Sequence, residues 1–130
     1  MNAVNYSSIA DIQKEESGKV VNLIGCVVHD PQLDEEITVK HHDTQSFKGR
    51  LFVKLSDGND SIQVNLWGEE LVGLKIVKDD TLLVMGARIS DKFGAIQLNV
   101  NSKDGKVTVN PKGYKQLKKS VNKTSTTLIQ

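Results

Sequence analysis

The sequence predicts an all-β domain, a five-stranded Greek-key barrel with one short helix between its third and fourth strands. Apolar and polar residues alternate along several short runs, which is typical of strands that bury one face. Gly25 interrupts the first of these runs, and a glycine inside a strand marks a bend that lets one strand serve two sheets. Since the chain has 130 residues, we expect one domain of this kind.

The first strand is expected over residues 19–28, where the sequence KVVNLIGCVV is apolar and rich in valine. Residues 32–49 are polar, and we expect a long loop there, with a local strand at 37–39. A loop of this length in a small domain is usually either functional or disordered.

The second and third strands are expected at residues 50–56 and 62–67, joined by a turn at 57–60 (DGND). Alternation assigns their inner face to Leu51, Val53, Leu55, Ile62, Val64 and Leu66. Their outer face then carries Arg50, Phe52, Lys54, Gln63, Asn65 and Trp67. The sequence therefore predicts an apolar interior beneath a basic, aromatic and amide-rich surface.

The one short helix is expected at residues 68–74, since Glu69 and Glu70 stand in its first turn, where the helix dipole favours acidic side chains. The elements that follow are a fourth strand at 81–89, a hairpin loop at 90–94, a fifth strand at 95–100 and a short edge strand at 106–109.

The net charge of +1 hides two oppositely charged segments. Residues 1–101 hold 10 Lys and Arg against 15 Asp and Glu, a net charge of −5, whereas residues 102–130 hold 7 Lys and 1 Asp, a net charge of +6. We divide the chain into an N-terminal arm or short helix (1–16), the barrel domain (17–112) and a basic C-terminal tail (113–130). Such a tail is typical of polyanion binding, and the alternative is a solvated tail without that role.

Composition argues against several classes of protein. No apolar run reaches the roughly 18 residues that a membrane-spanning helix needs, so we expect no membrane association. The N-terminal residues lack the apolar core of a secretory signal, and Cys26 is the single cysteine. These features are typical of a reducing compartment, so we expect a nuclear protein if the source is eukaryotic and a cytoplasmic one otherwise.

No metal site, cofactor or catalytic machinery is expected. His29, His41 and His42 show no recognised metal-ligand spacing with Cys26. The sequence also has no catalytic Ser/His/Asp order, phosphate-binding glycine loop or HExxH motif. We therefore expect a binding protein rather than an enzyme.

The order of five strands and one helix matches the oligonucleotide/oligosaccharide-binding (OB) fold, a Greek-key barrel that binds ligands on the face of its second and third strands. Within it, RLFVKLSDGNDSIQVNLWGEEL and KDDTLLVMGARISDKFGAIQLNV resemble the single-stranded DNA-binding domains of replication protein A. They also resemble the related single-domain proteins of archaea and eukaryotes and the telomere end-binding proteins. The resemblance spans about residues 18–110 and implies single-stranded DNA binding in replication, repair or telomere maintenance.

Three aromatic residues are the candidate base-stacking platforms. The resemblance implies a stacking aromatic at Trp67, and an outward ring on a strand is worth about 1–3 kcal/mol per stacked base. Phe52 lies on the same predicted face of the neighbouring strand, and Phe93 lies at the tip of the 90–94 loop. The alternative is that Trp67 covers the core and that Phe93 packs on its own hairpin.

The candidate phosphate contacts are basic residues on this face and on the strands beside it: Lys48, Arg50, Lys54, Arg88 and Lys92. Residues 37–56 carry a local net charge of +3 within an acidic barrel, and clustered cations are what phosphate tracking requires. The alternative is an ordinary solvated strand face. The candidates for hydrogen bonds to base edges are Gln63, Asn65, Gln97 and Asn99.

The sequence departs from several related single-domain proteins at Arg88 and Asn99, where those proteins carry stacking aromatics. We therefore expect fewer stacking contacts and either weaker binding or more hydrogen-bond readout. Two further interpretations stay open. One is an OB-fold scaffold subunit that mediates protein–protein assembly in a nucleic-acid-binding complex, with Trp67 or the tail as its anchor. The other is an RNA-binding OB domain, because the sequence does not show whether a 2′-hydroxyl is read.

Overall fold

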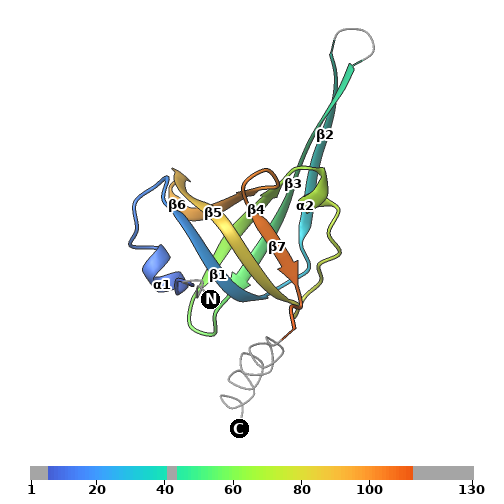
Figure 1. The fold of residues 1–130 in the computed structure, drawn as a ribbon. Helices are drawn as coiled ribbons and strands as arrows, with labels where there is room; N and C mark the ends of the chain where they lie inside the picture. The colour runs from blue at the N-terminus through green and yellow to red at the C-terminus, as the bar shows by residue number, and fades with distance from the viewer. Residues whose placement is uncertain (1–5, 41–43, 113–130) are drawn as a thin grey trace.

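Seven strands form one curved sheet in the computed structural model, which describes residues 6–40 and 44–112 (Figure 1). The strands are β1 (Val20–Val27), β2 (Gln32–Lys40), β3 (Thr44–Ser56), β4 (Ser61–Trp67), β5 (Thr81–Phe93), β6 (Ala95–Asn101) and β7 (Lys106–Val109). Helix α1 (Ile9–Ile12) precedes β1, and helix α2 (Glu69–Val72) lies between β4 and β5. Side chains are described in these ranges except at residues 35–48 and 93.

The hydrogen-bonded strands follow one another around a barrel in the order β1-β3-β4-β6-β5, and β5 pairs again with β1. These pairings are antiparallel, except that β4 and β6 run parallel. Strand β7 pairs with β5, and β2 pairs with β3 off this ring. The predicted all-β barrel, with a short helix between its third and fourth strands, is therefore confirmed. Neither helix in the described part of the chain is long and apolar enough to cross a membrane.

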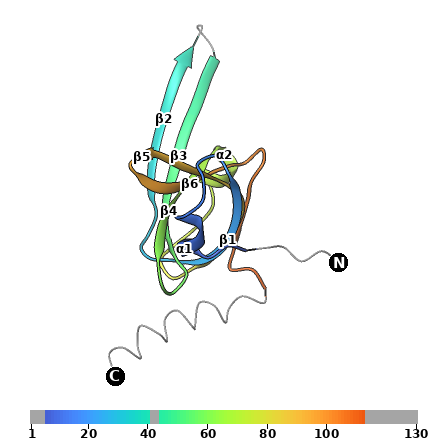
Figure 2. The same cartoon turned by 90° about the vertical axis from the view of Figure 1, so that its left-hand side faces the viewer.

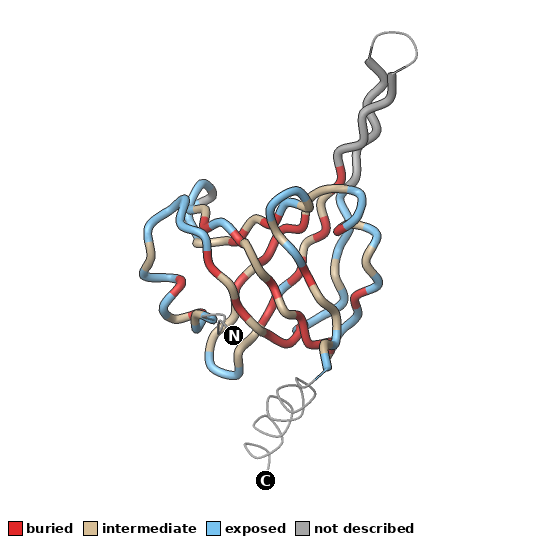
Figure 3. Tube along the Cα trace, in the orientation of Figure 1, coloured by how far each residue is buried: buried red, intermediate tan, exposed pale blue. Residues whose placement is uncertain are grey.

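The side chains that alternation assigned to the inner face are buried. Figure 3 shows the buried positions along the strands of the barrel. Leu55, Val64 and Leu66 have no exposed surface. They pack in one cluster with apolar residues of the other strands, among them Leu23, Leu82, Val84, Leu98 and Val100. Burying each such side chain contributes about 1.5–3 kcal/mol, so this interior accounts for most of the stabilisation.

Gly25 lies where β1 changes its partner. Residues from Val20 to Cys26 pair with β5, whereas Cys26 and Val27 pair with β3. A Cβ atom on Gly25 would lie 3.0 Å from the Cβ atom of Leu55 and 3.2 Å from a backbone oxygen of β3. The bend predicted at this glycine is therefore the place where β1 passes from one neighbour to the other.

The long loop expected at residues 32–49 is wrong, because this segment forms a β-hairpin. Strand β2 pairs with the first part of β3 in continuous antiparallel register, from Gln32 opposite Phe52 to Lys40 opposite Thr44. Figures 1 and 2 show that the hairpin extends beyond the barrel. A strand pair outside the barrel needs no continuous apolar face, so alternation is only partial here and indicated no more than the local strand at 37–39.

One smaller difference concerns the loop between β5 and β6. The loop expected at 90–94 is shorter, because β5 continues to Phe93 and β6 begins at Ala95. The expected arm at 1–16 includes α1, whose Ile9 and Ile12 side chains are fully buried in the core. The predicted basic tail at 113–130 lies outside the described residues.

Asp57, in the predicted turn between β3 and β4, connects this turn to helix α1. Its carboxylate accepts hydrogen bonds from the backbone N–H groups of Ile9 at 3.0 Å, Asp60 at 3.0 Å and Asn59 at 3.1 Å. Partial burial acts to raise the pKa of Asp57, but the backbone N–H groups of Asp60, Ile9 and Asn59 outweigh burial and hold it below its ordinary value. The ionised form therefore stabilises the fold.

The free energy of unfolding is expected to fall as the pH drops below about 4, because protonation of Asp57 weakens these hydrogen bonds. The stabilisation is complete above the pKa of the unfolded chain and is lost as pH falls through the lower pKa of the folded state. We expect Asp57→Asn to lower stability by about 1 kcal/mol at pH 7, after allowance for solvent screening.

Urea unfolding at several pH values measures this effect. The matched control is Asp91→Asn, because Asp91 is an exposed carboxylate of β5. We expect the stability curve of Asp57→Asn to be flatter than that of the control between pH 5 and pH 3. Equal acid sensitivity in the two variants would contradict the role of Asp57.

Candidate functional site

Most of the candidate residues lie in three neighbouring rows that cross the sheet. Residues directly opposite each other on paired strands point to the same face, so each row shares one surface of the barrel. The rows are Phe52, Asn65, Asn99 and Arg88; Arg50 and Trp67; and Lys54, Gln63 and Gln97. We call the outer surface formed by these residues the polar face. It is built by β3, β4, β6 and β5.

Arg50 contacts both aromatic rings of the polar face. Its Cζ atom lies 3.9 Å from the centroid of the Phe52 ring and 5.2 Å from that of the Trp67 ring, within the range of cation–π attraction. Its Nη2 atom donates to Asp34 Oδ2 at 3.2 Å, and the Asp34 side chain is 63% exposed. Its Nε atom is buried without a hydrogen-bond partner in the part of the chain that the structure describes. The guanidinium is thus held mainly by the rings, because an exposed ion pair contributes little.

Four amides and the Trp67 indole form a hydrogen-bonded network along the centre of the polar face. Gln63 Nε2 donates to Asn65 Oδ1 at 2.8 Å. Asn65 Nδ2 donates to Gln97 Oε1 at 3.0 Å and to Asn99 Oδ1 at 3.2 Å, and Trp67 Nε1 donates to the same Asn99 oxygen at 3.0 Å. Asn65 therefore lies on the predicted face, but it is only 1% exposed and has no free surface for a base.

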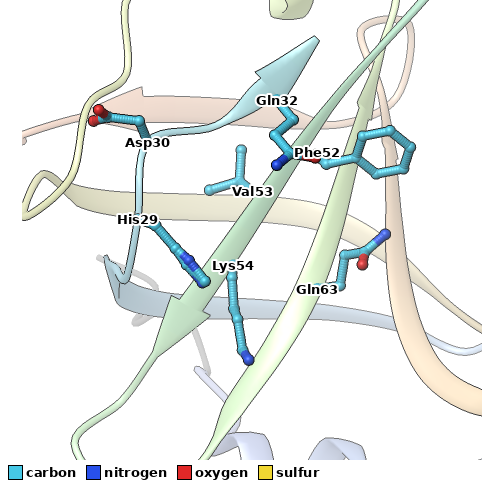
Figure 4. A pocket seen from close by; sticks show the side chains of 7 residues that line it. All are labelled: His29, Asp30, Gln32, Phe52, Val53, Lys54 and Gln63. Carbon is cyan, nitrogen blue, oxygen red and sulfur yellow. The ribbon is translucent and has the colours of Figure 1, made fainter. Parts of the chain in front are cut away.

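Three shallow hollows lined by described residues lie along the polar face. The first, of about 410 Å³, is lined by His29, Asp30, Gln32, Phe52, Val53, Lys54 and Gln63 (Figure 4). The second, also of about 410 Å³, shares Lys54 and Gln63 with the first and continues to Gln97. The third, of about 340 Å³, includes Trp67, Arg88 and Asn99 in its lining. Concave surface therefore lies on both sides of the amide network.

Figure 4 shows how β3, β4 and the segment between β1 and β2 enclose the first hollow. The side chains of Lys54 and His29 extend in the same direction, and the Phe52 ring projects at the other end. A cation and an aromatic ring thus border one concavity, which is the combination that a nucleotide needs for its phosphate and its base.

Three candidates lie outside these rows. Lys48 pairs through its backbone with β2, and Phe93 pairs with Ala95, but the side chains of Lys48 and Phe93 are outside the described residues. Lys92 is exposed near the end of β5, beyond a shift in the register between β5 and β6. Their predicted roles stay predictions.

Sequence reasoning missed the loop residues that border the hollows. His29 and Asp30 follow β1 and line the first hollow, and Asp104, between β6 and β7, lines the third together with the strand residues Gly86 and Asn101. Gln32 was missed for a different reason, since it lies opposite Phe52 only if β2 is a strand. The sequence carries no signal that separates such turn residues from other polar turn residues.

Among the residues that the structure describes, no three or more His, Cys, Asp or Glu side chains are grouped to hold a metal ion. The side chains of the polar face offer stacking, hydrogen bonding and charge attraction.

The ring of five strands, with its short helix between β4 and β5, defines an OB-fold domain. Residues 9–110 match the sequence model of the replication protein A OB domain, so the chain belongs to this family of nucleic-acid-binding OB folds. No curated protein sequence matches the chain significantly.

Solved structures share the fold at low sequence identity. A replication protein A heterotrimer bound to ssDNA has a TM-score of 0.69 and 18% identity, over 94% of this chain and 28% of that chain. The p204 HINb domain has a TM-score of 0.59 and 12% identity, over 81% and 47% of the two chains. A murine DNA binding protein bound with double-stranded DNA has a TM-score of 0.56 and 17% identity, over 79% and 46%. This chain thus spans less than half the length of each, and the likeness concerns the fold alone.

Proposed function

We propose that this domain binds single-stranded DNA across the polar face, stacking bases on Trp67 and Phe52 and holding phosphates with basic side chains, without catalysis. The observation that carries the proposal is the cluster in which Arg50 contacts both rings on an outer strand face. Membership of the replication protein A OB-domain family supports it. The proposed setting is replication, repair or telomere maintenance, in the nucleus if the source is eukaryotic.

Two exposed cations stand on opposite sides of the amide network and are the proposed phosphate contacts. Lys54 lies opposite Gln63, and Arg88 lies opposite Asn99. Neither forms an ion pair with a described residue, and Arg88 uses one donor, Nη1, on the Gly18 carbonyl oxygen at 3.0 Å. A guanidinium has five N–H donors, so Arg88 can hold a phosphate without losing this bond.

Arg50 is proposed to support the stacking rings and to add a third cation. An aromatic ring with a cation on one face keeps its other face for a base, and the cation adds attraction for the phosphates beside that base. The exposed Asp34 carboxylate is the only ion-pair partner of Arg50 in the described part of the chain, and a phosphate can replace it at little cost.

Trp67 is the only tryptophan, so its fluorescence reports directly on the polar face. Adding a single-stranded oligonucleotide of about 12 nucleotides is expected to quench the emission. Affinity should fall as salt rises, with a log–log slope of about −0.7 per phosphate contacted. In Lys54→Gln the slope should become shallower by about 0.7, because one contact is lost.

Lys106→Gln is the matched control, because Lys106 is exposed on β7, away from the polar face. It should leave the salt dependence unchanged. Unchanged emission at saturating oligonucleotide and low salt, together with no binding by a second method, would reject the proposed function.

An assembly role is the second candidate function. Leu33 is 53% exposed and Val77 is 56% exposed, and apolar side chains of this kind contribute to a protein contact when they form one patch. The solved replication protein A neighbour is a heterotrimer. The assembly role would be favoured if the protein bound no single-stranded oligonucleotide but formed a stable complex with other protein subunits. An RNA-binding domain would show tighter binding to an RNA than to the DNA of the same sequence.

A further inference from the structure

Trp67 sets the orientation of the amide network, because an indole N–H donates hydrogen bonds and cannot accept them. Asn99 must therefore turn its Oδ1 atom toward Trp67 Nε1, which lies 3.0 Å away. The same oxygen accepts from Asn65 Nδ2 at 3.2 Å, so the orientation of Asn65 follows from that of Asn99.

The orientation of Asn65 in turn fixes the orientation of Gln63 and Gln97. Asn65 donates to Gln97 Oε1 at 3.0 Å and accepts from Gln63 Nε2 at 2.8 Å. Reversing any one amide would set two oxygens or two NH₂ groups against each other. The network therefore has one arrangement of donors and acceptors.

This arrangement decides which polar atoms are left for a ligand. Asn99 Nδ2 and Gln97 Nε2 donate to no described residue, and both side chains are partly exposed. Gln63 Oε1 is the one unused amide oxygen in the network. The two side chains next to the network, Lys54 and Arg88, carry donors only. The amide network and its two cationic neighbours thus offer more donors than acceptors, and Asp104 is the one carboxylate in the lining of the third hollow.

We propose that this donor-rich surface selects keto bases over amino bases at the position beside Trp67. Thymine and uracil carry an oxygen at C4, and guanine carries one at C6, and each of these oxygens can accept from Asn99 Nδ2 or Gln97 Nε2. Cytosine and adenine carry an NH₂ group at the corresponding position, which would face another donor. The inference rests on the proposed function, because it specifies the base chemistry of the same surface.

Two oligonucleotides that differ only in the oxygen or NH₂ group on one kind of base provide the test. One contains thymidine and the other 5-methyl-deoxycytidine, and both are about 12 nucleotides long. The two bases share the ring size and the methyl group, so their stacking is closely similar. The wild-type protein is expected to bind the thymidine oligonucleotide about tenfold more tightly, the effect of one net hydrogen bond.

Asn99→Asp tests the residue proposed to make the selection. The carboxylate keeps the oxygen that Trp67 and Asn65 contact, but it replaces the NH₂ donor with a second acceptor. The preference for thymidine should disappear or reverse. Asn59→Asp is the matched control, because it adds the same charge in the exposed turn between β3 and β4, outside the polar face and the three hollows. It should weaken both oligonucleotides equally and keep the preference. Thermal unfolding checks that both variants fold.

The outcomes separate this inference from the function on which it rests. Equal affinity of the wild-type protein for the two oligonucleotides would overturn keto selection and leave single-stranded DNA binding intact. If Asn99→Asp still binds the thymidine oligonucleotide more tightly by the full wild-type factor, the proposed role of Asn99 in base selection is overturned. Failure of both oligonucleotides to bind would overturn the proposed function together with this inference.

Discussion

Trp67→Ala is expected to weaken single-stranded oligonucleotide binding by about 1–3 kcal/mol, roughly 5- to 150-fold in Kd. The substitution removes the proposed stacking platform. It also removes the N–H that Trp67 donates to Asn99 at 3.0 Å and one of the two rings that Arg50 contacts. The variant lacks tryptophan, so the anisotropy of a labelled oligonucleotide measures its affinity.

Trp67→Phe separates stacking from hydrogen bonding. Phenylalanine keeps an aromatic ring but has no N–H for Asn99. If stacking dominates, most of the affinity returns in Trp67→Phe. If Trp67→Phe binds as weakly as Trp67→Ala, the contribution of Trp67 comes through the amide network. Unchanged affinity in Trp67→Ala would contradict the stacking role and leave Trp67 with a packing role.

Gly86→Ala is expected to lower the free energy of unfolding by about 2–4 kcal/mol. Gly86 has a φ of +73°, a conformation that costs an L-residue about 1–2 kcal/mol. An added Cβ atom would also lie 2.5 Å from the Asp104 carbonyl oxygen and 3.0 Å from the Gly105 Cα atom. These are backbone atoms, so the neighbouring chain must shift to make room. Urea unfolding measures the loss.

Gly58→Ala is the matched control for this crowding. Gly58 has a φ of +97°, but an added Cβ atom would meet nothing within 4 Å. Its substitution should therefore cost only the conformational strain, about 1–2 kcal/mol. Losses of equal size in the two variants would show that contact with Asp104 does not contribute to the effect at Gly86.

The barrel could be predicted from the sequence because its strands bury one face. Leu51, Val53 and Leu55 alternate with polar residues for this reason, and all three are buried. The hairpin of β2 and β3 could not be predicted in the same way. It extends beyond the barrel, so its two strands need no apolar face, and local alternation carries no information about their pairing (Figure 2).

The composition of the polar face could also be predicted, but its internal contacts could not. Alternation alone places Phe52, Asn65 and Trp67 on the outer side of β3 and β4. Asn65 is buried because the parallel pairing of β4 with β6 places it opposite Asn99. That register joins residues distant in the chain, and no local pattern encodes it. The contact of Arg50 with Asp34 likewise depends on the part of β2 before residue 37, which the sequence did not indicate as a strand.

The amide network has a consequence for the entropy of binding. Freezing a polar side chain at an interface costs about 0.5–1.5 kcal/mol when that side chain is mobile in the free protein. Gln63, Gln97 and Asn99 are already held by hydrogen bonds to Asn65. A ligand that contacts these amides therefore meets a preorganised surface. The ordering of these amides is therefore complete when the barrel folds, before a ligand arrives.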